Sequence, residues 1–304
     1  MSKLIPKNDI KISFIGAGKV AFSLVPALLD KNYKISSVFD IHKESAAELA
    51  VKFNIKTYSD ALFNLDAANN VIVISVPDSD IKTVAGLLAL LELDFANTIF
   101  IHLSGSRNVR VLDALKNKGA YTASLHPMQT FPSRKKYSIK GTYLAVESEN
   151  PGVRELLSEL AEDLELVPFT VKTEEKIFYH LMGVFASNFF VANIYGAETA
   201  NELMSDEMPD MYKLLKPIIN ATFSNIAKTG SVEALSGPIE RGDFETIELH
   251  VNALSGNHEL LVHYLANSLT LLEVANIKGK LDPRQYNRMK LYLGSKLKEV
   301  SAHF

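Results

Sequence analysis

The chain contains no cysteine among its 304 residues, which excludes disulfides, zinc–thiolate sites and thiol nucleophiles. It also has no large excess of basic or of acidic residues. Its 32 basic and 35 acidic residues give a net charge of −3, unlike the basic footprint of a nucleic-acid-binding protein. Residues 1–8 form no apolar run of signal-peptide type, and no segment reaches about 20 uninterrupted apolar residues, the length of a membrane span. We therefore expect a cytoplasmic protein that binds neither nucleic acid nor membrane, with room for two domains.

A glycine-rich turn follows the first apolar run. Residues 11–21 read Lys-Ile-Ser-Phe-Ile-Gly-Ala-Gly-Lys-Val-Ala, so that Gly16 ends a strand, Gly18 follows and Ala21 takes a third small position. In a strand–turn–helix unit these positions allow a sharp turn, an approach of a pyrophosphate to the backbone, and close helix packing. The helix N-terminus adds free N–H groups and a positive dipole end. The motif predicts a dinucleotide site whose phosphate-binding residues are Gly16, Ala17, Gly18, Lys19 and Val20.

The residues after the second apolar run bear on which dinucleotide binds. Asp40 lies 24 positions after Gly16, where a carboxylate accepts hydrogen bonds from the adenosine ribose hydroxyls and favours NAD. His42 and Lys43 follow immediately and could instead face a 2′-phosphate, so NADP stays open. Asp40 could also simply end the strand or cap the next helix.

The first half of the chain alternates apolar runs with amphipathic segments, as in a parallel sheet covered by helices on both faces. The apolar runs are residues 12–15, 35–39, 71–76, 98–103, 120–125, 142–146 and 166–171. From residue 173 onward, helical patterns cover residues 174–199, 208–228, 244–254, 258–276 and 283–301. The sequence predicts an α/β protein in which a Rossmann-type, doubly wound domain (residues 1–171) precedes an all-helical substrate and dimerisation domain (residues 172–304).

Polar residues follow the ends of the later strands, where open parallel sheets bind ligands. Residues 75–77, Ser75, Val76 and Pro77, are expected beneath the nicotinamide ribose, although an ordinary turn would have the same composition. Ser104 places a hydroxyl near the expected nicotinamide. His102 lies within its strand and is expected to be buried and not catalytic.

His126 begins a loop that two prolines hold in an extended form. Hydride transfer at a C–OH or C=O centre needs a partner that exchanges the hydroxyl proton, and imidazole suits this role because it titrates near neutrality. The other interpretation is that His126 bonds a backbone carbonyl and fixes the loop.

Two residues of the helical half complete the predicted site. Asn188 interrupts an apolar helix face, and a buried amide there must be satisfied by protein or ligand. Arg241 lies in a glycine-bounded loop and can hold a substrate carboxylate. We expect a small, anionic substrate between the two domains, with Ser104 and Asn188 orienting the reacting group. No metal site is expected, because His258 and His263 miss the i, i+4 spacing that zinc needs.

Four further motifs follow the glycine turn in order: Ser-Val-Pro-Asp (75–78), His-Leu-Ser-Gly (102–105), His-Pro-Met-Gln-Thr-Phe (126–131) and Gly-Pro-Ile-Glu-Arg-Gly-Asp (237–243). Over nearly its whole length the chain resembles Rossmann-like NADP oxidoreductases whose helical C-terminal domain is an uncharacterised relative of that of 6-phosphogluconate dehydrogenase. Pyrroline-carboxylate reductase, coenzyme-F420-dependent NADP reductase and prephenate dehydrogenase are more distantly similar. In prephenate dehydrogenases a His-Pro histidine bonds the reacting hydroxyl, which supports the role given to His126.

The resemblance implies NADP as cofactor and a homodimer formed through the helical domain. The chain departs from 6-phosphogluconate and hydroxyisobutyrate dehydrogenases, because His180 and residues 183–184 stand where a lysine upstream of Asn188 is expected. This difference argues against a simple β-hydroxyacid dehydrogenase. A dinucleotide-binding sensor or scaffold without turnover is the alternative function. The substrate, the direction of reaction and a role for another hydride carrier such as F420 stay open.

Overall fold

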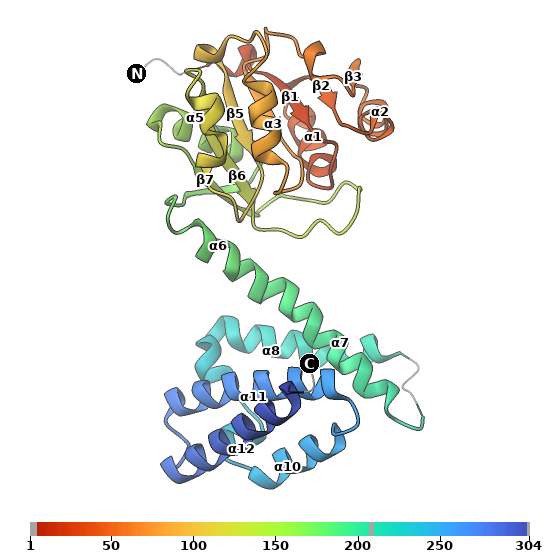
Figure 1. Cartoon of the computed structure of the whole chain (residues 1–304), viewed down its shortest axis with the longest axis vertical. Helices are drawn as coiled ribbons and strands as arrows, with labels where there is room; N and C mark the ends of the chain where they lie inside the picture. The colour runs from red at the N-terminus through yellow and green to blue at the C-terminus, as the bar shows by residue number, and fades with distance from the viewer. Residues whose placement is uncertain (1–4, 207–209, 303–304) are drawn as a thin grey trace. The chain divides into compact units, whose positions relative to one another are not determined.

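The computed structural model describes residues 5–206 and 210–302 (Figure 1). Contacts within the chain define two compact units, Met1–Asn188 and Phe189–Phe304. The first unit contains a β-sheet covered by helices, and the described part of the second is helical. This arrangement confirms the predicted α/β fold class.

The sheet has eight strands in the order β3-β2-β1-β4-β5-β6-β7-β8. All neighbouring strands are parallel except β6 and β7, which pair antiparallel. The strand order reverses between β1 and β4, the point at which open sheets of this type bind ligands beyond the strand ends. The strands are β1 (Lys11–Ile15), β2 (Lys34–Phe39), β3 (Thr57–Ser59), β4 (Val71–Ile74), β5 (Ile99–His102), β6 (Tyr121–Pro127), β7 (Tyr143–Glu147) and β8 (Val167–Thr170).

Successive strand residues point to opposite faces of the sheet, and each face has its own core. Phe14 and Val73 pack on the face covered by α1, α2 and α5, whereas Ile15 and Ile74 pack on the face covered by α3, η4 and α4. Both faces are therefore buried, which explains the continuous apolar strand sequences. The helices of these layers are α1 (Ala21–Asp30), α2 (Lys43–Lys52), α3 (Ile81–Leu88), α4 (Asp113–Lys116) and α5 (Pro151–Asp163). The short 3₁₀ helices are η1 (Lys7–Asp9), η2 (Leu62–Asn64), η3 (Phe95–Asn97) and η4 (Val109–Leu112).

Helix α6 (Lys176–Gly183) belongs to the first unit, and a π-helix, η5 (Val184–Asn188), follows it. Tyr179 packs α6 against Ala145 of β7 and Val171, on the same sheet face as α3. The predicted first domain ends at residue 171, whereas the first compact unit extends to Asn188 because α6 is anchored on the sheet.

The second unit is built around α11 and α12. Leu265 and Leu272 of α11 are fully buried with Leu293 of α12. Asp243, Asn257 and Asp282 cap the N-termini of α10, α11 and α12 by accepting main-chain hydrogen bonds. The helices are α7 (Phe189–Glu202), α8 (Met211–Ala234), α9 (Pro238–Arg241), α10 (Phe244–Ala253), α11 (His258–Lys278) and α12 (Pro283–Ser301).

Two helical segments, Lys176–Glu202 and His258–Lys278, are long and apolar enough to cross a membrane by length and composition. Core helices that are mostly buried meet the same criterion, whereas only 6% of the apolar stretch of the first segment and 28% of that of the second are buried. The first segment begins with Lys176, which is buried in an ion pair with Glu147 of β7, so its first turns are packed on the sheet.

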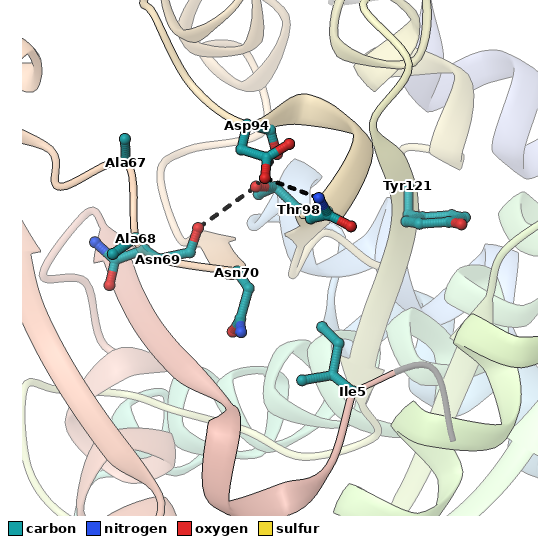
Figure 2. A pocket seen from close by; sticks show the side chains of 9 residues that line it. Ile5, Ala67, Ala68, Asn69, Asn70, Asp94, Thr98 and Tyr121 are labelled. Atoms are coloured by element: carbon teal, nitrogen blue, oxygen red, sulfur yellow. Dashed lines mark hydrogen bonds between the residues drawn. The ribbon is translucent and has the colours of Figure 1, made fainter. Parts of the chain in front are cut away.

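A cavity of about 290 Å³ lies at the amino-terminal edge of the sheet, next to the residues that precede β4 and β5 (Figure 2). Some of its polar groups bond one another: Thr98 Oγ1 lies within hydrogen-bond distance of the carbonyl oxygens of Asp94 (2.7 Å) and Asn69 (3.4 Å), and Asn97 Nδ2 donates to Asp94 Oδ2 (2.8 Å). The buried Asn69 Oδ1 has no hydrogen-bond partner among the described residues. The predicted functional motifs follow the opposite, carboxyl ends of the strands.

Candidate active site

The glycine turn joins the ends of three adjacent strands. Gly16 N donates to Phe39 O of β2 (2.6 Å), and Ser75 N, after β4, donates to Ile15 O of β1 (2.7 Å). Gly16 has a φ of +101°, and a Cβ on it would lie 2.4 Å from Ser75 O. Only glycine fits this position, because a side chain would meet both a strained backbone conformation and a main-chain oxygen.

A cavity of about 680 Å³ opens beside this turn, between the ends of β1, β2 and β4 and the first turn of α3. Its size suits a nucleotide or another small ligand. Seven of the predicted cofactor residues line it: Gly16, Gly18, Asp40, His42, Ser75, Val76 and Pro77. Of the others, Ala17 is buried, Val20 is the partly buried N-cap of α1, and Lys19 and Lys43 are exposed.

Asp40 lines the cavity, and its carboxylate is already bonded to the main chain. Oδ2 accepts a hydrogen bond from Ala17 N (2.8 Å), and Oδ1 accepts one from His42 N (2.9 Å). Asp40 therefore ties the glycine turn to the start of α2, and each oxygen keeps a second lone pair for a ligand.

Arg134 also lines this cavity, and sequence reasoning missed it. It comes from the loop between β6 and β7, and its Nη1 donates to Ser45 Oγ of α2 (2.9 Å). The two residues are 89 positions apart, so no local motif indicates the contact.

A second group of polar side chains lies near the carboxyl ends of β5 and β6, on the sheet face that α6 covers. His102 is fully buried, as predicted, and its Nδ1 accepts a hydrogen bond from Ser104 N (3.2 Å). Burial, together with the charge of Lys176, lowers the pKa of His102 to about 3. His102 is therefore neutral at physiological pH.

His126 is held by Tyr179 of α6. The Tyr179 hydroxyl donates to the His126 carbonyl oxygen (3.1 Å), so its contact with His126 Nδ1 (2.9 Å) has Nδ1–H as the donor. The neutral imidazole then has its lone pair on Nε2. Burial and the charges of Lys176 and His180 lower the pKa of His126 to about 4, while burial raises the pKa of Tyr179 to about 12.

Gly105 is the point where two histidines converge. A Cβ on Gly105 would lie 2.7 Å from His126 Nε2 and 2.6 Å from His180 Nδ1. The two imidazole rings stand nearly perpendicular, with centroids 6.0 Å apart. His126 Nε2 therefore faces a second imidazole that is partly exposed, and His180 is a functional candidate that the predicted site omitted.

A buried ion pair fixes α6 beneath these histidines. Lys176 Nζ lies 3.0 Å from Glu147 Oε2, both side chains are at most 2% exposed, and Lys176 also donates to Ser124 Oγ of β6. Glu147 Oε1 accepts from Val109 N (3.0 Å). Burial lowers the pKa of Lys176, and the pairing with Glu147 opposes this shift. The network joins α6, β6, β7 and η4 at one place.

Ser104 organises the loop after β5. Its hydroxyl and that of Ser106 each donate to Asp78 Oδ2 (2.7 Å), and Ser104 Oγ accepts from Arg107 N (2.9 Å). Burial would raise the pKa of Asp78, but these hydrogen bonds outweigh burial and lower it. The contacts join the loops that follow β4 and β5.

The remaining predicted residues lie elsewhere in the chain. Asn188 is exposed at the end of the π-helix in the first unit, and Arg241 is exposed at the end of α9 in the second unit. Among the described residues, no three histidine or carboxylate side chains are arranged to hold a metal ion.

Comparisons with known protein families agree with this architecture. Residues 2–127 match the model of a Rossmann-like domain, and residues 142–271 match a family described as "Domain of unknown function (DUF2520)". The chain thus pairs a Rossmann-like domain with a DUF2520 domain. These matches confirm the predicted resemblance in its architecture, a Rossmann-like domain followed by an uncharacterised helical domain.

Solved structures share the fold. A Bacteroides fragilis protein named a "putative NADP oxidoreductase" is 24% identical, with a TM-score of 0.73 over 87% of this chain and 98% of its own. The protein TM1727 from Thermotoga maritima is 26% identical, with a TM-score of 0.66 over 88% and 99%. Prephenate dehydrogenase from Aquifex aeolicus, in complex with hydroxyphenyl propionate and NAD⁺, is 15% identical, with a TM-score of 0.54 over 97% and 96%. The comparison with curated proteins gave no match.

Proposed function

We propose that the chain is an NAD(P)-dependent oxidoreductase that transfers a hydride between a nicotinamide cofactor and a small, anionic substrate. The observation that supports this best is a row of groups at the carboxyl ends of adjacent strands: the glycine turn after β1, Ser75 after β4, Gly105 after β5 and His126 in β6. A dinucleotide along this edge would have its adenosine half near β2 and its nicotinamide half near β4 and β5. The NADP and NAD⁺ named for the similar structures support the same cofactor class.

The residues of the large cavity fit such a cofactor. Residues 16–20 bind the pyrophosphate, because Gly16 and Gly18 line the cavity without side chains, and residues 75–77 lie beneath the nicotinamide ribose. Asp40 holds the turn and offers its remaining lone pairs to the ribose. The bound cofactor supplies the hydride donor or acceptor.

His126 exchanges the substrate's hydroxyl proton in this proposal. Its Nδ1–H is used on Tyr179, which leaves the Nε2 lone pair to accept from the reacting hydroxyl. Its lowered pKa, about 4, keeps the ring neutral and prevents it from retaining the proton. His180 lies beside Nε2 and is partly exposed, so it is suited to pass the proton on to solvent.

The other predicted residues orient the substrate. Ser104 acts through its loop, because its own hydroxyl hydrogen is bonded to Asp78. Asn188, which is exposed at the end of η5 in the same compact unit, positions the reacting group.

The test begins with cofactor binding. Wild-type protein should bind NADPH or NADH, followed by nicotinamide fluorescence, and Gly18→Trp should abolish binding because the indole would occupy the pyrophosphate's place. Turnover is then measured as NADPH consumption with a panel of ketones, 2-oxo acids and cyclic imines. His126→Asn should retain cofactor affinity while losing about 10²–10⁴ in rate.

Two results would contradict this proposal. A folded Gly18→Trp protein that titrates like wild type would show that the cofactor site is misplaced. Tight cofactor binding without turnover on any member of the panel would favour the sensor or scaffold function instead.

We also propose a cytoplasmic homodimer. The segment formed by α6, η5 and α7 exposes large apolar side chains, among them Phe178, Met182, Val191 and Tyr195. A self-complementary contact between two copies would cover such a surface with two-fold symmetry.

A further inference from the structure

The cavity beside the glycine turn receives one guanidinium group from a distant part of the chain. Arg134 lines the cavity together with Asp40 and His42, which follow β2. Its Nη1 donates to Ser45 Oγ and lies 3.7 Å from Glu48 Oε2, both on α2. The guanidinium therefore lies at the side of the cavity where β2 ends and α2 begins.

The loop that holds Arg134 is anchored on α1. Ser23 of α1 is fully buried; its hydroxyl donates to Lys135 O (3.3 Å) and accepts from Tyr137 N (3.0 Å). The two hydrogen bonds of Ser23 hold the backbone next to Arg134 in place, so little ordering remains for a ligand to impose. The nearby ion pair of Lys136 with Asp30 (3.0 Å) is exposed and adds little to this anchor.

The charges around Arg134 indicate that its side chain is suited to bind an anionic group of a ligand. Asp40, Asp60 and Asp80 also line the cavity, so an anionic ligand needs a compensating cation. Both oxygens of Asp40 accept main-chain hydrogen bonds, so the residue expected to favour NAD has a role in holding the turn. Arg134 keeps further N–H donors besides the one that bonds Ser45, in the planar arrangement that matches phosphate.

We propose that Arg134 binds the 2′-phosphate of NADP and makes this chain select NADP over NAD. This inference rests on the proposed dinucleotide site and adds which of the two dinucleotides the site prefers. The adenosine ribose lies at the end of β2 in such a site, within the part of the cavity that Arg134 lines. His42 lines the same part of the cavity and adds a hydrogen-bonding side chain, and the exposed Lys43 follows it in the sequence.

The experiment measures the affinities of NADPH and NADH for wild type, Arg134→Ala and Lys136→Ala by nicotinamide fluorescence. Wild type should prefer NADPH. Arg134→Ala should weaken NADPH binding about 10- to 100-fold, the usual effect of losing hydrogen bonds to a charged group. The affinity for NADH should change less than about threefold. Lys136→Ala is the matched control, because Lys136 lies on the same loop and its ion pair is with Asp30; both affinities should stay at wild-type values.

Competition with 2′,5′-ADP and 5′-AMP isolates the phosphate, since these probes differ only in the 2′-phosphate. Wild type should favour 2′,5′-ADP, and Arg134→Ala should lose that preference. Equal weakening of NADPH and NADH would place Arg134 on the pyrophosphate and overturn the inference. Equal wild-type affinities for NADPH and NADH would overturn it while leaving the proposed function intact, whereas binding of neither would overturn both.

Discussion

Gly105 brings two imidazoles together, and this pairing has a measurable electrostatic effect. The charge of His180 is one of the influences that lower the pKa of His126, after burial and Lys176. His180→Gln should therefore raise the pKa of His126, while burial keeps it below the ordinary value of 6.5. Histidine NMR titration measures this shift. His42→Gln changes an exposed histidine elsewhere and should leave the pKa of His126 unaltered. An unchanged pKa in His180→Gln would contradict the pairing.

The buried histidines also make folding sensitive to acid. His102 and His126 have pKa values of about 3 and 4 in the folded chain, against 6.5 when unfolded. Between pH 6.5 and 4 the unfolded chain binds more protons, so the free energy of unfolding falls as the pH falls. Each histidine contributes a slope of up to about 1.4 kcal/mol per pH unit. Urea unfolding of His102→Asn between pH 7 and 5 should show a smaller slope than wild type. Identical slopes for the two proteins would contradict the assignment.

Local motifs predict a functional residue only where chemistry demands a local spacing. Gly16, Gly18 and Asp40 follow from a strand, a turn and a helix that are adjacent in sequence, and the structure places all three at one cavity. Arg134 contacts Ser45 across 89 positions, and no spacing rule describes that contact. His180 was visible in the sequence only as a departure from an expected lysine.

At the level of secondary structure, the central strands β1, β4 and β5 are apolar because both of their faces are buried. The apolar runs of the sequence predicted these strands and the other long ones. They missed β3, which has three residues of which two are exposed. The apolar runs also could not predict that β7 is antiparallel to β6, because the direction of a strand depends on its pairing partners and not on its composition. The pattern predicted one helix over residues 174–199, where the structure has α6, a π-helix and α7. Lys176, Tyr179 and His180 share one face of α6 by their i, i+3 and i+4 spacing, a signal that could have linked them to His126.

The anchoring of α6 depends on a buried ion pair, and removing one partner leaves the other charge uncompensated. Lys176→Met should lower the free energy of unfolding by roughly 3–5 kcal/mol. The double variant Lys176→Met/Glu147→Leu removes both charges and should recover much of that loss. Urea denaturation measures each value. Lys136→Met breaks an exposed pair and should cost less than about 1 kcal/mol. A double variant as unstable as the single one would show that the stability lies in other contacts.

For the whole molecule, the exposed apolar surface of α6 to α7 predicts the state of association. Phe178 and Met182 are 67% and 66% exposed on successive turns of α6. Sedimentation at micromolar concentration should show a dimer, and Phe178→Asp/Met182→Asp should shift it toward monomer without loss of helical content. Sedimentation of the wild type as a monomer would contradict the proposed homodimer. Partition of the wild type into lipid vesicles would instead assign this surface to a membrane.

The stretch of chain that begins with His126 and Pro127, at the end of β6, and runs to the start of β7 also contains Arg134. A single stretch of chain therefore contains both His126, the proposed proton-exchange group, and Arg134, which we propose binds the 2′-phosphate of NADP. Chemistry and cofactor preference are then inherited as one module. Grafting this stretch from a relative would transplant both traits together, and a designer who wants to alter only one of them must change single residues within it.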